Sequence, residues 1–175
     1  MQRRWPYLGI ATFILVAIAS GALAAEQRHR FRPADGAALR AWDDLLQRDT
    51  HIRQDARRHR FRARRDLSAL RVDLGGDHQP ELILYADLIS YCGSAGCVAR
   101  ILTRREGRWV LACETHLEGG NGLIVDTVRT AGWRNLRGTY RMTWREDAIS
   151  PAGVACMEGE TVPRSQQARP DPNSR

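Results

Sequence analysis

The chain has 175 residues, of which 43% are hydrophobic and 27% are charged, and its formal net charge is +7. This length suits a single domain that buries a real core, and the sequence contains no internal repeat that would indicate a second one. All 27 basic residues are arginine; 12 of them lie between residues 28 and 65 against five acidic residues, so the positive charge belongs to one segment.

The first 24 residues are typical of an export signal. Arg3 and Arg4 precede an uncharged apolar run, and Ala22-Leu23-Ala24 supplies the small residues that a signal peptidase accepts. We expect cleavage before Ala25, with an uncleaved membrane anchor as the alternative. The protein is therefore predicted to be periplasmic or secreted, with residues 25–34 as a leader.

One amphipathic helix is predicted to follow this leader. Asp35 can cap the helix by accepting hydrogen bonds from the amides of its first turn. Four apolar residues then fall on one face at helical spacing: Leu39, Trp42, Leu45 and Leu46. We expect this helix to lie on the core of a single domain that spans residues 35–160.

Residues 53–65 form a basic segment that could be a charged helix extension, an exposed edge strand or a mobile arm. Arginine clusters bind phosphate and carboxylate groups through paired hydrogen bonds. The segment offers six candidate anion-binding residues: Arg57, Arg58, Arg60, Arg62, Arg64 and Arg65. Export argues against nucleic acid as the partner and favours an anionic envelope component or another envelope protein. The alternative is a solvated charged face.

From residue 67 onward the pattern changes to short strands. Apolar residues alternate or cluster in seven segments of strand length: 70–74, 81–88, 97–104, 108–115, 122–129, 138–146 and 153–158. Arg105-Glu106-Gly107 is a predicted hairpin turn, and residues 161–175 are a predicted disordered tail. The predicted fold class is α+β, with the N-terminal helix followed by a mainly antiparallel sheet, barrel or sandwich of six or seven short strands.

The loop "DLGGDHQPE", residues 73–81, partly matches a calcium-binding pattern. Such loops place oxygen ligands at alternate positions, and Asp73, Asp77 and Glu81 fit that spacing. Gly75 offers no side-chain ligand, and His78 stands where the sharp turn favours glycine. The loop is either a weak cation site or a polar β-turn, and calcium is the one cofactor that the sequence suggests.

Three motifs in order resemble a loose group of small exported bacterial proteins. These are the loop 73–81, the "YCGSAGC" stretch 91–97 and the "GWRNL" stretch 132–136. The group's pattern is D-x-N-G-D-G-x-P-E, then C-G-x-x-G-C, then a glycine-aromatic-x-D-L segment. The resemblance implies a β-rich extracytoplasmic domain and no particular activity. Asn135 departs from the aspartate of the third motif.

Four cysteines in an exported chain predict two disulfides. Of the three possible pairings we favour Cys92–Cys97 and Cys113–Cys156. Four intervening residues between two strands are atypical of a catalytic dithiol, which usually has two at a helix start. The spacing of Cys113 and Cys156 also lacks the paired knuckles of a structural zinc site.

No residue can be assigned a catalytic role from the sequence. Ser94 lacks the glycine at position 92 that a nucleophile elbow would need. We expect an exported, disulfide-stabilised, non-enzymatic binding protein of the cell envelope. The alternatives are a calcium-binding module, a hydrolase inhibitor or an envelope enzyme. An enzyme would need a cleft with convergent polar groups, for example beside His116 or Glu114.

Overall fold

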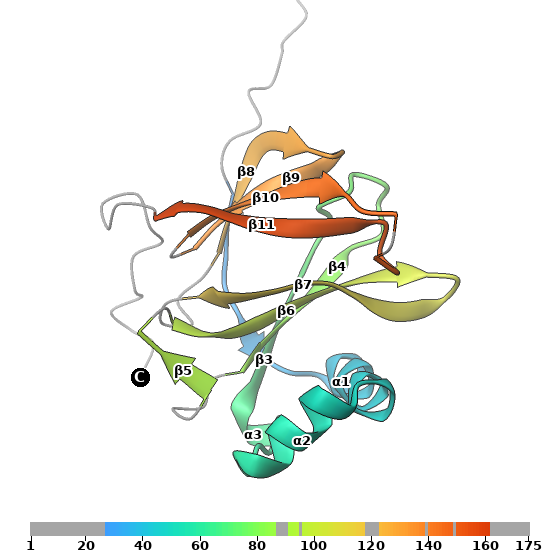
Figure 1. The fold of residues 1–175 in the computed structure, drawn as a ribbon, viewed down its shortest axis with the longest axis vertical. Helices are drawn as coiled ribbons and strands as arrows, with labels where there is room; N and C mark the ends of the chain where they lie inside the picture. The colour runs from blue at the N-terminus through green and yellow to red at the C-terminus, as the bar shows by residue number, and fades with distance from the viewer. Residues whose placement is uncertain are drawn as a thin grey trace, which may run out of the picture.

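The computed structural model describes residues 27–86, 91–94, 96–117, 123–138, 140–148 and 150–161. Its strands form two antiparallel sheets, and helices lie against one of them (Figure 1). The predicted β-rich, mainly antiparallel character is confirmed. The predicted signal segment 1–24, and the predicted tail beyond residue 161, lie outside the described residues. Within these ranges no helix is long and apolar enough to cross a membrane.

Sheet A is the upper layer in Figure 1 and contains five strands. In spatial order they are β1 (Gln27–His29), β8 (Leu123–Thr130), β9 (Trp133–Arg137), β10 (Tyr140–Glu146) and β11 (Val154–Thr161). Strand β1 pairs with β8 although the sequence assigns it to a leader. The folded domain therefore begins before Asp35.

Sheet B is the central layer and contains six strands. In spatial order they are β2 (Arg32–Pro33), β3 (Leu67–Val72), β4 (Glu81–Ala86), β6 (Gly96–Arg105) and β5 (Cys92–Gly93), with β7 (Arg108–Leu117) also paired to β6. Neither sheet closes into a barrel in the described part of the chain. The two sheets instead face each other across a shared apolar core, as in a sandwich.

The side of sheet B that faces away from sheet A is covered by helices. These are α1 (Gly36–Arg48), α2 (Thr50–Arg58) and the single turn α3 (Ala63–Asp66). Helix α1 occupies the segment predicted to be helical. Helices α2 and α3 fall largely in the basic segment, which is thus mainly helical rather than an edge strand or an arm.

Two apolar clusters show that sheet B is buried on both faces. The core between the sheets includes Ile83 and Tyr85 of β4, whereas the core beneath the helices includes Leu82 and Leu84 of the same strand. Side chains of a strand point alternately to its two faces, so every residue of β4 is buried. This explains why its sequence, ELILYA, is a nearly continuous apolar run.

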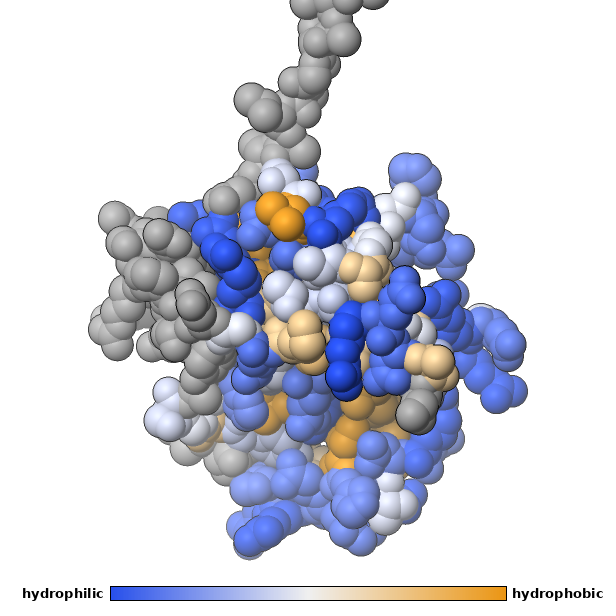
Figure 2. All heavy atoms as spheres, turned by 45° about the horizontal axis from the view of Figure 1, so that its top comes forward, coloured by the Kyte–Doolittle hydropathy of each residue, from blue (hydrophilic) through white to orange (hydrophobic). Residues whose placement is uncertain are grey.

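The outer surface of the molecule is largely polar. Figure 2 shows hydrophilic residues over most of the face that it presents, with small apolar areas between them. Among the described residues the exposed large hydrophobic side chains are Val128 and Met157. On the face shown in Figure 2 the described residues form no broad apolar patch.

Two tight hairpin turns use left-handed backbone conformations. Strands β6 and β7 are joined through Glu106 and Gly107, with φ angles of 51° and 77°, as the sequence predicts for this turn. Strands β8 and β9 are joined in the same way through Ala131 and Gly132, with φ angles of 46° and 79°. This second turn was not predicted, because Ala-Gly is a weaker turn signal than Asn-Gly.

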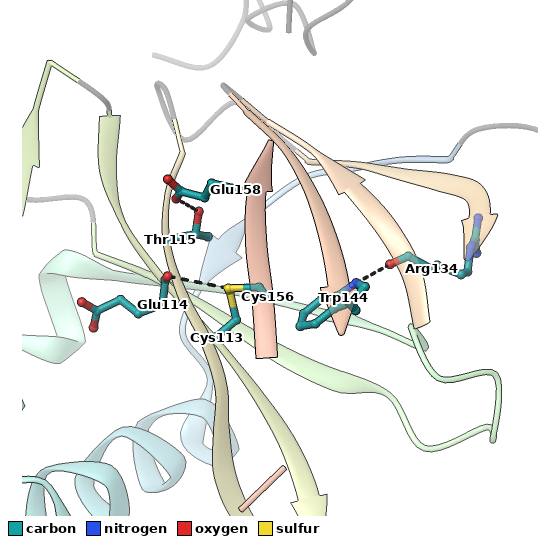
Figure 3. The surroundings of a disulfide bond; sticks show 7 residues. All are labelled: Cys113, Glu114, Thr115, Arg134, Trp144, Cys156 and Glu158. Carbon is teal, nitrogen blue, oxygen red and sulfur yellow. Dashed lines mark hydrogen bonds between the residues drawn. A yellow bond between two sulfur atoms is a disulfide. The ribbon is translucent and has the colours of Figure 1, made fainter. Parts of the chain in front are cut away.

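Both predicted disulfides are present and confirmed. Cys92–Cys97 joins facing residues of the β5–β6 hairpin, whereas Cys113–Cys156 joins β7 of sheet B to β11 of sheet A (Figure 3). Thr115 donates a hydrogen bond to Glu158 between the same two strands. The long-range disulfide therefore fixes one sheet to the other, beyond merely anchoring the C-terminal segment.

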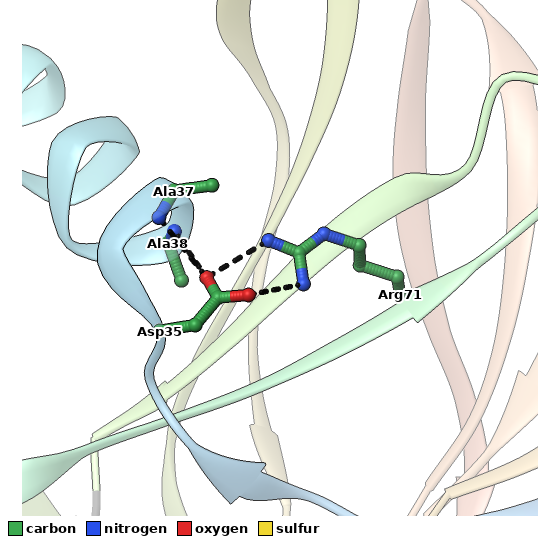
Figure 4. Close-up of polar contacts among 4 residues, drawn as sticks. All are labelled: Asp35, Ala37, Ala38 and Arg71. Atoms are coloured by element: carbon green, nitrogen blue, oxygen red, sulfur yellow. Dashed lines mark hydrogen bonds and ion pairs between the residues drawn. The ribbon is translucent and has the colours of Figure 1, made fainter.

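The predicted cap of α1 is present and is reinforced by an ion pair (Figure 4). One oxygen of Asp35 accepts hydrogen bonds from the amides of Ala37 and Ala38, at 3.1 and 2.9 Å. Both Asp35 oxygens also accept from the Arg71 guanidinium of β3, at 2.9 Å each. The Arg71 hydrogen bonds lower the pKa of Asp35 to about 2, and the backbone amides contribute to this shift.

The two disulfides should differ in their contribution to stability. In the chain-entropy model a cross-link stabilises more when it closes a longer loop, and the sequence separations are 43 and 5 residues. Replacing Cys113 and Cys156 by serine should lower the free energy of unfolding by about 4 kcal/mol, against about 2 kcal/mol for Cys92 and Cys97. Denaturant unfolding of the two double variants measures this difference, and equal losses would contradict it.

The Asp35 carboxylate should make stability depend on acidity. Its pKa in the folded protein, about 2, lies below its ordinary value of 3.8, so its contribution is present above pH 4 and is lost between pH 4 and pH 2. At neutral pH Asp35→Ala should lower the free energy of unfolding by about 1 kcal/mol. Below pH 4 the difference in the free energy of unfolding between wild type and variant should become smaller, as measured by urea unfolding. Asp35→Asn, which keeps a capping oxygen, is the control.

Candidate functional site

A groove on the outer side of the helix layer collects four arginines. It has a volume of about 650 Å³ and lies between α1 and the segment that runs from α2 to residue 62. Arg53, Arg57, Arg60 and Arg62 line it together with the apolar side chains of Leu46, Ala56 and Phe61. We call it the arginine groove. Asp43 and Gln47 complete its lining.

The six predicted anion-binding arginines do not form one patch. Arg57, Arg60 and Arg62 meet in the arginine groove, whereas Arg58 lines a different cavity. Successive residues of a helix point about 100° apart, so Arg57 and Arg58 of α2 face different surroundings. Arg64 is exposed and lines neither space. The prediction missed Arg53, one turn before Arg57 on the same face of α2.

Arg65 has a structural partner. Its guanidinium donates to the buried carboxylate of Asp66, which also accepts from the Arg62 amide at 2.8 Å. The Arg65 hydrogen bond lowers the pKa of Asp66, against the opposing effect of burial. In the described part of the chain, by contrast, Arg57, Arg60 and Arg62 have no carboxylate within ion-pair distance. The Arg57 and Arg60 guanidinium groups are therefore available to an anion, whereas Arg62 also acts electrostatically on the Asp66 carboxylate.

A second, larger cavity lies between α2 and strands β6 and β7. Its volume is about 770 Å³, and its lining includes Asp55 and Arg58 from α2. Arg100 of β6 and Glu114 of β7 line its opposite side. Asp49, His51, Ile52, Gln54 and Leu111 complete the lining. We call it the charged cavity. It provides convergent polar groups beside Glu114, which an enzyme cleft would need.

Arg100 is the most unusual residue of the charged cavity because it is buried in a central strand. Only 4% of its surface is exposed, and its Nε lies 2.7 Å from an oxygen of Glu114, the residue directly opposite in the β6–β7 pair. Its guanidinium also stacks on the Trp42 ring of α1, 5.5 Å from the ring centre. In Figure 3 the Glu114 side chain points away from the neighbouring disulfide. Arg100 stands out in the apolar run CVARILT, and this was the available sequence signal.

Asp55 lies among aromatic and basic neighbours at the edge of the charged cavity. His59 Nε2 lies 3.4 Å from its carboxylate, and the His59 ring meets the Tyr91 ring edge-on at 5.1 Å. Tyr91 is buried beside Asp55, and its pKa is raised first by burial and then by the Asp55 carboxylate. The phenol of Tyr91 thus stays protonated at neutral pH.

The three carboxylates of the predicted calcium loop accept hydrogen bonds from groups of the chain itself. Glu81 is buried and accepts from the Leu74 amide at 2.7 Å and from the Thr103 hydroxyl at 3.1 Å; burial raises its pKa. Asp73 accepts from the amides of Gly76 and His78. The remaining carboxylate, Asp77, accepts from the Gln79 amide. In the described ranges no three His, Cys, Asp or Glu side chains cluster as a metal site.

A guanidinium group occupies the carbonyl side of the same loop. Arg129 of β8 donates to the carbonyls of Leu74 and Gly75 in the loop after β3 and to that of Gly132 in the β8–β9 turn, at 3.1, 3.0 and 2.7 Å. Gly76, with a φ angle of 77°, lies against this guanidinium, and a Cβ there would be 2.7 Å from it. The positive charge nearest to these carbonyls is therefore part of the chain, and it ties the loop to sheet A.

Comparisons with protein-family models, with curated proteins and with solved structures found no match for this chain. The resemblance to a group of small exported proteins remains a prediction.

Arg129 should matter for stability although it is exposed. Arg129→Gln shortens the side chain and removes charged donors from three carbonyls, which should lower the free energy of unfolding by about 1–2 kcal/mol. Arg145→Gln, an exposed change on strand β10 of the same sheet, should stay within about 0.5 kcal/mol of wild type. Urea unfolding compares the two variants, and equal losses would show that the Arg129 bridge adds nothing.

Proposed function

We propose that this protein is an exported, disulfide-stabilised binding protein that recognises anionic lipids of the cell envelope through the arginine groove. The observation that carries this proposal is the meeting of Arg57, Arg60 and Arg62 in one groove, where no carboxylate of the described residues lies within ion-pair distance of them. Export rests on the N-terminal signal pattern, and two disulfides are compatible with an oxidising compartment.

The chemistry of the groove favours phosphate. A guanidinium group offers planar, paired donors that match phosphate oxygens, and several such groups around one space bind better than isolated charges. Because these side chains are already gathered by α2 and the turn that follows it, little further ordering of the backbone is needed. A phosphate group would therefore meet three or four positive charges at once.

The apolar part of the lining favours a lipid over a free anion. Leu46 and Phe61 are only partly buried, and Phe61 packs on the Trp42 ring with 5.1 Å between ring centres. An apolar wall beside a basic rim matches a molecule that carries an anionic head group and an adjoining hydrocarbon portion. Anionic phospholipids and the phosphorylated lipids of an outer membrane share this chemistry.

Vesicle binding tests this proposal. Purified protein should cosediment with phosphatidylglycerol-containing vesicles at low salt, release as ionic strength rises, and ignore pure phosphatidylcholine. Each arginine near an anionic surface contributes about 1 kcal/mol, so Arg57, Arg60 and Arg62 changed together to glutamine should weaken binding by about 100-fold.

A matched variant separates the groove from net charge. Changing Arg108, Arg141 and Arg145 to glutamine removes the same charge from exposed positions elsewhere and should leave binding close to wild type. Equal weakening by the two triple variants would show that only overall charge matters. Absence of binding to every anionic vesicle would overturn the proposal.

A further inference from the structure

The charged cavity is built around a buried guanidinium group that has donors to spare. A guanidinium carries five N–H donors, and the ion pair with Glu114 is made through the Nε of Arg100. Burying a charged side chain is costly, and the Trp42 ring and the Glu114 carboxylate offset this cost. Arg100 therefore brings hydrogen-bonding capacity and positive charge to the wall of a space open to small molecules.

The same cavity presents charges of both signs on two separate elements. Arg58 and Asp55 come from α2, whereas Arg100 and Glu114 come from the sheet below. Glu114 is 46% exposed, so one of its oxygens can accept from a ligand while the other meets Arg100. The fourth group, Asp55, lies 3.4 Å from His59 and beside the Tyr91 phenol, and a carboxylate has enough acceptor positions for a ligand as well.

We propose that the charged cavity binds a small zwitterionic ligand, of which a short peptide with free ends is the simplest example. Arg58 and Arg100 would hold the ligand's carboxylate, and Asp55 and Glu114 would hold its ammonium group. A volume of about 770 Å³ lies in the range of small-molecule sites. A ligand with only one charge would engage only the arginines or only the carboxylates, so the cavity would bind it less tightly than a zwitterion.

This site is distinct from the arginine groove. Arg58 faces the charged cavity and Arg57 faces the arginine groove, so one helix separates the two. The lining of the charged cavity includes three carboxylates, Asp49, Asp55 and Glu114, whereas the arginine groove has only Asp43. A purely anionic lipid head group therefore suits the groove and not the cavity.

Calorimetry with tri-alanine tests the proposal. Tri-alanine should bind the purified full chain at pH 7, and either N-acetylation or C-terminal amidation of the peptide should weaken binding by about tenfold or more. Arg58→Gln should weaken the binding of tri-alanine. It should also reduce the difference in affinity between the peptide with a free C-terminal carboxylate and its amide. Glu114→Gln should likewise reduce the difference in affinity between the peptide with a free N-terminal amine and the N-acetylated peptide.

The variants also separate this site from the arginine groove and from misfolding. Arg58 is exposed, so Arg58→Gln should keep the wild-type melting temperature, and Arg57, Arg60 and Arg62 changed together to glutamine should bind tri-alanine as wild type does. No heat with tri-alanine, or equal binding of the free and blocked peptides, would overturn the proposal. An unchanged acid-over-amide preference in Arg58→Gln would remove Arg58 from the site.

Discussion

The burial of sheet B on both faces is the constraint on which the rest of this structure depends. Sheet A covers one face and the helices cover the other, so the inner strands can carry a charged side chain only where a partner compensates it. Arg100 meets this condition through Glu114 on the paired strand and through the Trp42 ring. The one buried charge of β6 thus lies beneath the helix layer, where it faces the charged cavity.

The two sheets are joined by a few specific links in addition to their shared apolar core. The disulfide Cys113–Cys156 connects β7 with β11, and the Arg129 guanidinium connects β8 with the loop after β3. That loop resembles a calcium-binding loop in sequence, but its carboxylates accept from the backbone and its carbonyls accept from Arg129. The Arg129 guanidinium thus orders a turn that is rich in oxygen atoms, a role that a bound cation has in calcium-binding loops.

Helix α2 connects the two candidate sites. Its Arg57 side lines the arginine groove, and its Asp55 and Arg58 side lines the charged cavity. The helix holds this position because Ile52 and Ala56 pack on the core and because Asp49 caps its first turn. Helix α2 is too polar to form a core by itself, but these two apolar contacts and the cap fix its position. Its arginines then lie on opposite sides of the helix.

The sequence by itself determined the elements whose signals are local. Alternating apolar residues identified most of the strands, the spacing of Leu39, Trp42 and Leu45 identified a helix, and the cysteines of an exported chain indicated the disulfides. The strands and the helix depend on residues a few positions apart. Disulfides depend on the oxidation of cysteines, which can pair whatever their distance along the chain. The short strands β1, β2 and β9 were missed because two or three paired residues, or a run interrupted by arginine, carry too little pattern.

The candidate sites were decided only by the tertiary structure. From the sequence, Arg57 to Arg65 read as one basic patch. The 100° step between Arg57 and Arg58, the end of α2 and the separate turn α3 divide it among a groove, a cavity and an ion pair with Asp66. The pairing of Arg100 with Glu114 depends on the register of two strands, and their meeting with Asp55 depends on how α2 packs on the sheet. Sequence spacing does not encode such contacts, because they join residues that are up to 59 positions apart only after the layers have assembled.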